Sequence, residues 1–263
     1  MLTLVPTPIG NLADISKRAI QALDNSDIIF CEDTRITKKL LNLLEISYSN
    51  KTFYSMHSHN ENDIISKLDI SIFDKNIVYV SDAGMPGISD PGSKLIQFAQ
   101  KNNIKYDVFP GANAVLSAFV ASGFEGEFTF FGFLPHKGNE RDKKLKEVIN
   151  HDKIAIIYES PHRIEKLLNE LKQEIPDRIV FFVKELTKLH QTFIKDEVKN
   201  INLKNTKGEW VVVIDKTIKN DVLSLNYDDI LSLKLHPKEK AKLLSKISSK
   251  STKEIYNEII NKG

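Results

Sequence analysis

Short apolar runs alternate with amphipathic segments through the first part of the chain. Apolar, β-branched runs predict strands, and apolar positions three or four residues apart predict helices. Each junction from an expected strand to an expected helix carries Gly, Pro, Asp or Asn. This alternation predicts a mostly parallel sheet that binds ligands at the carboxyl ends of its strands. The expected strands are 2–5, 27–32, 76–81 and 106–109, and the expected helices are 14–23, 36–44, 62–72, 94–101 and 112–122.

A second α/β block follows an acidic, glycine-containing link at residues 122–127. The run FTFFGFL at 128–134 has too many apolar residues for an alternating strand, which predicts a buried one. The pattern therefore predicts two α/β domains, residues 1–122 and 123–222. The other expected elements of the second block are strands at 153–160, 178–186 and 209–215 and helices at 140–149 and 164–171.

The strand pattern stops near Leu223, and residues 223–263 predict a small helical appendage. Three short helices are expected there, at 228–235, 237–247 and 252–260. From Lys234 to Lys262 the chain has eight Lys and three Glu, a net charge of +5. This stretch is either a solvated helical face or a surface that contacts RNA.

The composition is that of an ordinary globular protein. The chain has 263 residues, of which 41% are hydrophobic and 27% charged, and its net charge of +2 does not by itself indicate a polyanionic partner. No apolar run approaches the roughly 20 residues that a membrane span needs, and the N-terminal segment lacks the features of a signal peptide. Cys31 is the only cysteine, which excludes an intrachain disulfide and indicates a reducing cytoplasm.

Three turns rich in glycine and proline follow expected strands, at residues 6–12, 81–92 and 109–114. The first, PTPIGNL, lacks the glycine spacing of a dinucleotide-binding loop. In the second, SDAGMPGISDPG, small residues let a ligand approach the backbone, and the acids can accept hydrogen bonds from a ribose or an amino group. Alternatively, Ser89 or Asp90 only caps the next helix. Turns of this kind at one sheet edge predict a ligand site.

Two acids and an arginine follow the second expected strand, in the segment Cys31–Arg35. Charged groups at a strand end need a partner or solvent, so this segment is either a structural salt bridge or part of a reactive site. The chain has only five Arg against 32 Lys, and a planar guanidinium suits phosphate or carboxylate. Metal-ligand spacings, a nucleophile elbow and a Walker loop are absent from the sequence. Metal binding, serine hydrolysis and P-loop chemistry are therefore not expected.

Six motifs, in the same order and over nearly the whole chain, carry a family resemblance: PTPIGNL, EDTR, SDAG-x-P-x-ISDPG, PGANA, ESPHR and ELTKLH. Together they resemble the bacterial 16S ribosomal RNA cytidine-2′-O-methyltransferases of the tetrapyrrole methylase superfamily. The resemblance implies a homodimer with S-adenosylmethionine in a cleft between two α/β domains. It also implies that the substrate is a cytidine in the decoding centre of the small ribosomal subunit, and that the helical C-terminal piece belongs to the family pattern.

The resemblance implies roles for particular residues. The expected cofactor-binding residues are Pro8, Gly10, Ser81, Asp82, Ala83, Gly84, Gly111 and Ala112 from the first domain and Tyr158, Leu186 and Glu209 from the second. The expected catalytic residues are Glu32, Asp33 and Arg35, with His57 and His59 as helpers. Arg163 and Lys188 are expected to contact the RNA backbone.

Two other functions fit the same motifs. One is methylation of a tetrapyrrole precursor, which the lysine-rich tail and the ESPHR and ELTKLH segments disfavour. The other is a non-catalytic RNA-binding assembly protein with an inactive cofactor cleft. An enzyme should bind S-adenosylmethionine and a protein with an inactive cleft should not, so a binding measurement distinguishes the two.

Overall fold

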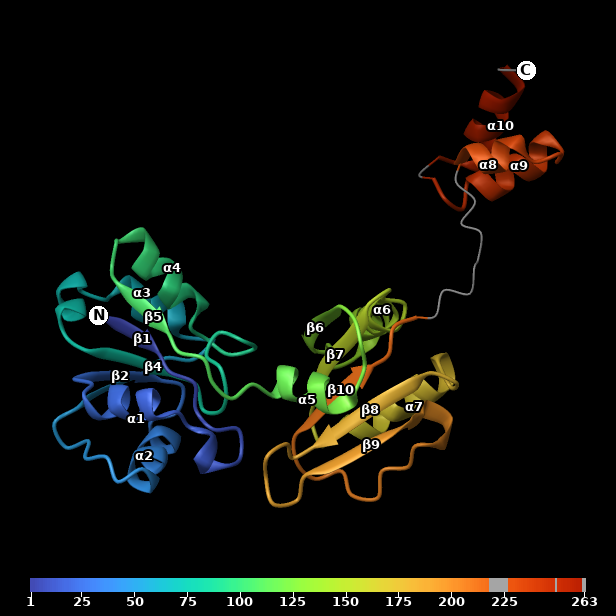
Figure 1. The fold of residues 1–263 in the computed structure, drawn as a ribbon. Coiled ribbons are helices and arrows are strands. Elements are labelled where there is room, and N and C mark those ends of the chain that lie inside the picture. The colour runs from blue at the N-terminus through green and yellow to red at the C-terminus, as the bar shows by residue number, and fades with distance from the viewer. Residues whose placement is uncertain (218–226, 249, 262–263) are drawn as a thin grey trace. The chain divides into compact units, whose positions relative to one another are not determined.

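The computed structural model describes residues 1–217, 227–248 and 250–261 (Figure 1). Residues Met1–Thr217 form one compact unit, and the remaining described residues form another. The expected boundary between residues 222 and 223 lies outside the described residues. In the described part of the chain, no helix combines the length and the apolar character needed to cross a bilayer.

The first sheet has five strands, all parallel, in the order β3-β2-β4-β1-β5. It confirms the predicted parallel α/β architecture. The strand β3 was not predicted, because it lies at the sheet edge and its residues are mostly exposed, which leaves no continuous apolar run. The strands are β1 (Leu2–Leu4), β2 (Ile28–Cys31), β3 (Thr52–Ser55), β4 (Ile77–Val80) and β5 (Tyr106–Val108).

Helices cover both faces of this sheet (Figure 1). Alternate residues of β2 point to opposite faces, so Ile28 and Phe30 pack with α3 and α4 while Ile29 and Cys31 pack with α1 and α2. Burial on both sides explains why the inner strands are apolar throughout. The helices are α1 (Lys17–Asp24), α2 (Thr34–Leu43), α3 (Glu61–Ser66) and α4 (Ser93–Lys101), with 3-10 helices η1 (Leu12–Asp14) and η2 (Ile70–Asp74).

Two helix predictions for this domain differ from the structure. The helix expected from residue 14 begins at Lys17, because the Ser16 side chain accepts a hydrogen bond from the Ala19 backbone N–H and caps α1 there. The single helix expected over 62–72 is wrong. The segment forms α3, which ends at Ser66, and then η2, which begins after the capping side chain of Asp69.

The second sheet is mixed, in the order β6-β7-β10-β8-β9, and only the β6–β7 pair is parallel. The expectation that 128–134 is buried is wrong: β6 is an edge strand, its residues are at least partly exposed, and Phe133 is 53% exposed. The other edge strand, β9, was missed because it has only two apolar residues, Phe193 and Ile194, and most of its residues are exposed. The strands are β6 (Phe128–Phe133), β7 (Ile154–Glu159), β8 (Ile179–Lys184), β9 (Thr192–Glu197) and β10 (Trp210–Ile214).

One face of the second sheet packs against α6 (Gly138–Ile149), α7 (Ile164–Glu174) and the 3-10 helix η3 (Val198–Asn200). The other face packs against α5 (Ala114–Ser122), whose Val115 and Ala118 join a core with residues of β7, β8 and β10. The helix α5 therefore precedes the expected link in sequence but covers the second sheet. This packing places the residues that follow β5 next to both sheets.

The described C-terminal residues form three short helices around a small core of their own, which includes Ile230, Ala241, Leu244 and Ile255. The helices are α8 (Tyr227–Ser232), α9 (Pro237–Leu244) and α10 (Thr252–Asn261), close to the predicted ranges. Lys250 pairs with Glu258 at 2.5 Å. The exposed lysines that form no ion pair with the described residues are Lys234, Lys238, Lys242, Lys246 and Lys253. Lys262 lies outside the described residues.

Candidate functional site

The loops that follow β1, β2, β4 and β5 meet at the carboxyl edge of the first sheet and line a cleft of about 440 Å³. The second domain supplies the opposite wall through the ends of β6, β7 and β8 and the start of β10. The lining residues are Ile9, Glu32, Asp82–Met85, Ile88–Asp90, Asn113, Ala114, Phe133, Tyr158–Pro161, Val183, Leu186 and Glu209–Val211. This is the position at which parallel α/β sheets bind ligands.

Six of the eleven expected cofactor-binding residues line this cleft: Asp82, Ala83, Gly84, Tyr158, Leu186 and Glu209. Among the expected catalytic residues, Glu32 lines it as well. The other five expected cofactor-binding residues do not line the cleft themselves and lie one or two positions from lining residues in the chain: Pro8, Gly10, Ser81, Gly111 and Ala112. The structure therefore brings together the parts of three turns that the sequence placed at one edge.

Gly84 is held in place by backbone pairing with Thr7. The two residues exchange hydrogen bonds of 3.0 Å, and the buried Ser81 hydroxyl donates to the Gly84 carbonyl at 3.2 Å. Gly84 has a φ of +83°, which favours glycine, and a Cβ there would lie 3.1 Å from Ile9 Cγ2. The first and second turns are thus held together by hydrogen bonds, and the Gly84 backbone lines the cleft.

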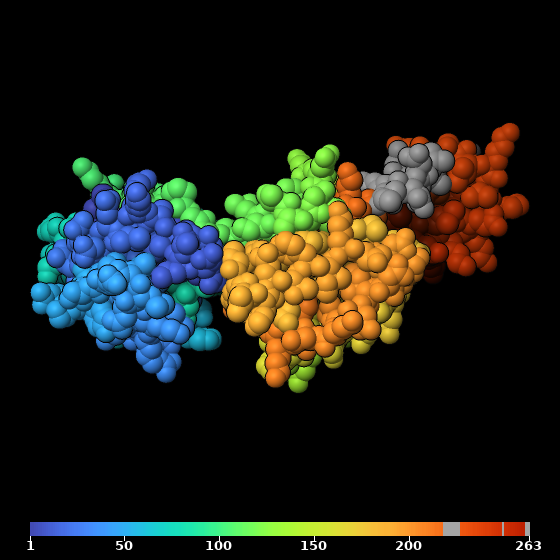
Figure 2. Space-filling view, turned by 60° about the horizontal axis from the view of Figure 1, so that its bottom comes forward, coloured from blue at the N-terminus to red at the C-terminus, as the bar shows by residue number. Residues whose placement is uncertain are grey.

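The glycines at positions 10 and 111 serve packing. A Cβ on Gly111 would lie 2.5 Å from Pro6 Cβ, and a Cβ on Gly10 would lie 2.4 Å from Lys188 Cγ and 2.7 Å from Thr187 Oγ1. Gly10 therefore lets the first turn approach the second domain closely. In the space-filling view the first residues of the chain, in dark blue, border an orange part of the second domain (Figure 2).

Two acids of the first domain hold the loops of the cleft together. The Glu32 carboxylate accepts a hydrogen bond from the Asp82 backbone N–H at 2.9 Å, and the Asp82 carboxylate accepts one from the Asp33 backbone N–H at 3.1 Å. Burial raises the pKa of Glu32 and of Asp82 above their usual values. Hydrogen bonds to these two carboxylates, which also line the cleft, therefore join the segment after β2 to the segment after β4.

Asp33 and Arg35 form a surface pair at the start of α2. The Asp33 carboxylate caps the helix by accepting from the Arg35 backbone N–H and also binds the Arg35 guanidinium at 2.6 Å. The hydrogen bond from the guanidinium lowers the pKa of Asp33 to about 2. The predicted salt bridge is therefore present, but it lies at the surface, because the Arg35 side chain is 89% exposed. The guanidinium remains accessible to a second anion.

His57 and His59 are exposed on the loop after β3, with ring centroids 6.1 Å apart. Burial raises the pKa of Glu32, and His57 acts in the opposite direction. Neither histidine is among the residues that line the cleft. Over residues 1–217, 227–248 and 250–261, His, Cys, Asp and Glu side chains do not gather in groups of three that would hold a metal.

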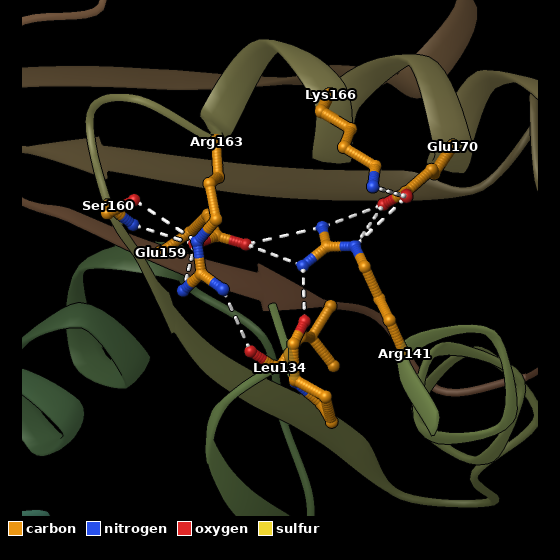
Figure 3. A network of polar contacts seen from close by, with 8 residues as sticks. Leu134, Arg141, Glu159, Ser160, Arg163, Lys166 and Glu170 are labelled. Atoms are coloured by element: carbon orange, nitrogen blue, oxygen red, sulfur yellow. Dashed lines mark hydrogen bonds and ion pairs between the residues drawn. The ribbon is translucent and has the colours of Figure 1, made fainter. Parts of the chain in front are cut away.

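The ESPHR segment forms a buried ion-pair network (Figure 3). The fully buried Glu159 pairs with Arg163 at 2.7 Å and with Arg141 at 3.4 Å, and Arg141 also pairs with Glu170 at 2.8 Å. The Arg163 guanidinium donates further to the Leu134 carbonyl at 3.0 Å. These contacts join the end of β7 to α6, α7 and the segment after β6.

Both basic residues expected to contact RNA are occupied by internal contacts. Arg163 is only 17% exposed and is committed to the network just described. Lys188 binds Glu185 at 3.0 Å and Glu209 at 2.8 Å, and its side chain is 30% exposed. An RNA contact through these two side chains stays a prediction. Their observed contacts hold the second-domain wall in shape.

Phe133 and Glu159 line the cleft although the sequence assigned them no site role, and Asp90 lines it as one of the two acids of the second turn. The alternative that Ser89 or Asp90 caps the next helix is wrong, because the N-cap of α4 is Gly92 and no side chain caps it. The signal for Asp90 was its place in the glycine-rich turn. Phe133 had no such signal, since its exposure depends on the irregular pairing of β6 with β7.

A parallel sheet whose strand-end loops face a mixed second sheet across a cleft defines a two-sheet α/β protein with a ligand site at the strand ends. The family model "Tetrapyrrole (Corrin/Porphyrin) Methylases" matches residues 1–202, so the chain belongs to this family. A relative from Campylobacter fetus subsp. fetus (strain 82-40), "Ribosomal RNA small subunit methyltransferase I", is 47% identical over 99% of this chain and 100% of its own length.

Solved structures show the same fold. The methyltransferase CobJ matches with a TM-score of 0.60 and 17% identity over 82% of this chain and 94% of its own. A uroporphyrin-III C-methyl transferase from Thermus thermophilus, complexed with S-adenyl homocysteine, matches with a TM-score of 0.55 and 13% identity over 81% and 96% of the chains. These findings confirm the expected fold and the expected class, a methyltransferase of the tetrapyrrole methylase superfamily.

The cleft has the features that S-adenosylmethionine requires. It is walled by the bare backbone of Ala83 and Gly84, by apolar residues of the second domain such as Leu186, and by the acids Glu32 and Asp82. Backbone groups and small side chains suit an adenosyl group, and carboxylates attract the cationic sulfonium of this methyl donor. Residues that the structure places around the cleft therefore fit the cofactor that the family uses.

Proposed function

We propose that this protein uses S-adenosylmethionine to methylate the 2′-hydroxyl of a cytidine in the decoding centre of 16S ribosomal RNA. The observation that carries the proposal is the cofactor-sized cleft at the carboxyl edge of the first sheet, which Glu32 lines. The exposed Arg35 follows Glu32 in the chain, and the exposed His57 and His59 follow the neighbouring strand β3. The name of the Campylobacter relative, which is similar over its whole length, supports the small-subunit RNA as substrate. We further propose that the protein works as a cytoplasmic homodimer.

The residues of the cleft divide into two groups in this proposal. Ala83, Gly84, Tyr158, Leu186 and Glu209 hold the cofactor. S-adenosylmethionine supplies an activated methyl group, so the protein has mainly to align the hydroxyl oxygen with it and to accept a proton.

The reacting side of the cleft is the segment after β2 with the loop after β3. Glu32 lines the cleft and Arg35 is exposed beside it on the chain. In the proposal, Arg35 binds a phosphate next to the target ribose, Asp33 orients the guanidinium, and His57 and His59 contact the same RNA segment.

The test is methylation of small ribosomal subunits taken from cells that lack this protein. Purified protein and S-adenosylmethionine should add one methyl group, and mapping of the modified nucleotide should place it on a cytidine ribose in the decoding centre. Methylation at a base, or at another site, would contradict the proposed reaction. Absence of both S-adenosylmethionine binding and methyl transfer would favour the non-catalytic assembly protein, and transfer to a tetrapyrrole precursor would favour the other alternative.

The C-terminal helices are proposed to bind RNA through their exposed lysines. Replacing Lys234, Lys238, Lys242, Lys246 and Lys253 by Gln should weaken binding of small subunits while leaving affinity for S-adenosylmethionine unchanged. Each lost phosphate contact should reduce the slope of log affinity against log salt by about one unit. Filter binding at several salt concentrations measures this slope.

Lys143→Gln with Lys146→Gln on α6 is the matched control, since both side chains are exposed in the second domain. Equal slopes for the tail variant and the wild type would show that the tail is a solvated face.

A further inference from the structure

Three carboxylates line the first-domain wall of the cleft, and they differ in what they already bind. Glu32 and Asp82 each accept a backbone hydrogen bond. Asp90 accepts none from the residues that the structure describes, although it lines the same cleft. We infer that Asp90 is the proton acceptor for the hydroxyl that is methylated, an inference that rests on the proposed function.

Backbone conformation and hydrogen bonds fix the course of the loop around Asp90. Ser89, directly before it, has a φ of +64°, a conformation that non-glycine residues rarely adopt. Directly after it, the Pro91 carbonyl accepts from the Gly87 backbone N–H at 3.0 Å, and the Gly92 backbone N–H donates to the buried Glu61 carboxylate at 3.0 Å. Strained backbone that is held on both sides is typical of residues kept in place for function.

A second polar group near Asp90 also lacks a partner. The Tyr79 hydroxyl is buried and, among the described residues, has no hydrogen-bond partner. Its electrostatic neighbours include Glu32, Glu61 and Asp90, and its ring lies against Gly92. Tyr79 does not line the cleft, so of these two groups Asp90 is the one that a ligand in the cleft can reach.

The charges that surround Asp90 suit a base that works near neutral pH. Burial raises its pKa from 3.8 to about 7, and the neighbouring carboxylates of Glu32 and Asp82 add to this effect. From the second domain, Tyr158 lines the same cleft; burial raises its pKa to about 12, and Asp90 and Glu209 add to this effect. A carboxylate with a pKa near the working pH is ionised enough to accept a proton and basic enough to draw it away.

The proposed step conserves atoms and charge. The ribose oxygen forms a bond to the methyl carbon, and its proton passes to an Asp90 oxygen. The bond between that carbon and sulfur breaks, and the electron pair stays on sulfur, which becomes neutral. Asp90 then releases the proton to solvent, so the protein returns to its starting state.

The test compares wild type with Asp90→Asn on small subunits that lack the modification. General-base contributions are typically about 100- to 10,000-fold, so kcat should fall by that factor in the variant, while affinity for S-adenosylmethionine stays within about threefold. For the wild type, kcat/KM should rise with pH up to about 7 and then level, and this rise should be absent from the residual activity of Asp90→Asn.

A stability measurement separates catalysis from a structural role. Because folding raises the pKa of Asp90, the folded state holds a proton that the unfolded chain releases between about pH 4 and pH 7, so ionisation of Asp90 lowers stability as pH rises through that window. At pH 8, Asp90→Asn should therefore melt no lower than wild type. The exposed Asp142 on α6 is the matched control, and Asp142→Asn should keep wild-type turnover.

Three results would overturn the inference. Wild-type turnover in Asp90→Asn would show that no proton passes to this group. An equal loss of cofactor affinity would make Asp90 a cofactor ligand. Retention of the pH-dependent rise in Asp90→Asn, with its loss in His57→Gln, would assign the proton to His57. Absence of methyl transfer by the wild type is a distinct result, which contradicts the proposed function as well.

Discussion

Glu159→Gln should lower the free energy of unfolding by about 3–5 kcal/mol, because it removes the negative charge between two guanidinium groups in a buried network. Glu159 and Arg141 are both fully buried, so solvent cannot replace the lost interaction. Arg141 would keep Glu170, but Arg163 would lose its one carboxylate partner among the described residues. Urea denaturation followed by circular dichroism measures the change.

Glu127→Gln is the control for this prediction. It removes an acid of similar chemistry from the Lys153–Glu127 pair, in which Glu127 is 76% exposed, and should change stability little. Similar midpoints for Glu159→Gln and Glu127→Gln would show that the network contributes no more than a surface pair. The Arg163 contacts would then be free to exchange for an RNA contact, as the sequence predicted.

Arg35→Ala should leave the melting temperature near that of the wild type and reduce methyl transfer about 10- to 100-fold in kcat/KM, as expected for the loss of one charge-assisted contact of about 1.5–3 kcal/mol. The side chain is 89% exposed, so its removal leaves no buried charge without a partner. Asp33→Asn should act in the same direction, since Asp33 orients the guanidinium. Affinity for S-adenosylmethionine should be unchanged in both.

Arg18→Ala is the matched control, because Arg18 also forms an exposed pair with an aspartate, Asp107, and lies at a separate groove near Met1. It should retain wild-type transfer. A large fall in melting temperature for Arg35→Ala would assign Arg35 a structural role instead. Wild-type transfer in both Arg35→Ala and Asp33→Asn would move the reacting side towards His57 and His59.

Some site residues could be predicted because of chain topology. Parallel strands end at one edge of the sheet, so the turns that contain Gly84 and Glu32 had to lie near each other whatever their exact conformation. The sequence could not reveal the state of each side chain there. Arg163 and Arg35 look alike in the sequence, yet one is enclosed by Glu159 and Leu134 and the other is exposed.

The sequence by itself determined the parallel first sheet, the two α/β blocks, the helical C-terminal piece and the turns that form the cleft, because continuous apolar runs and glycine-proline turns impose local structure. Only the tertiary structure decided which strands lie at the edges of the sheets. The edge positions explain why β3 and β9 lack a buried apolar pattern and why Phe133, on the edge strand β6, reaches the cleft. It also decided that Asp90 remains without a hydrogen-bond donor among the described residues, whereas Glu32 and Asp82 bind backbone. Such differences depend on contacts between segments about 50 residues apart, which no local pattern of residues encodes.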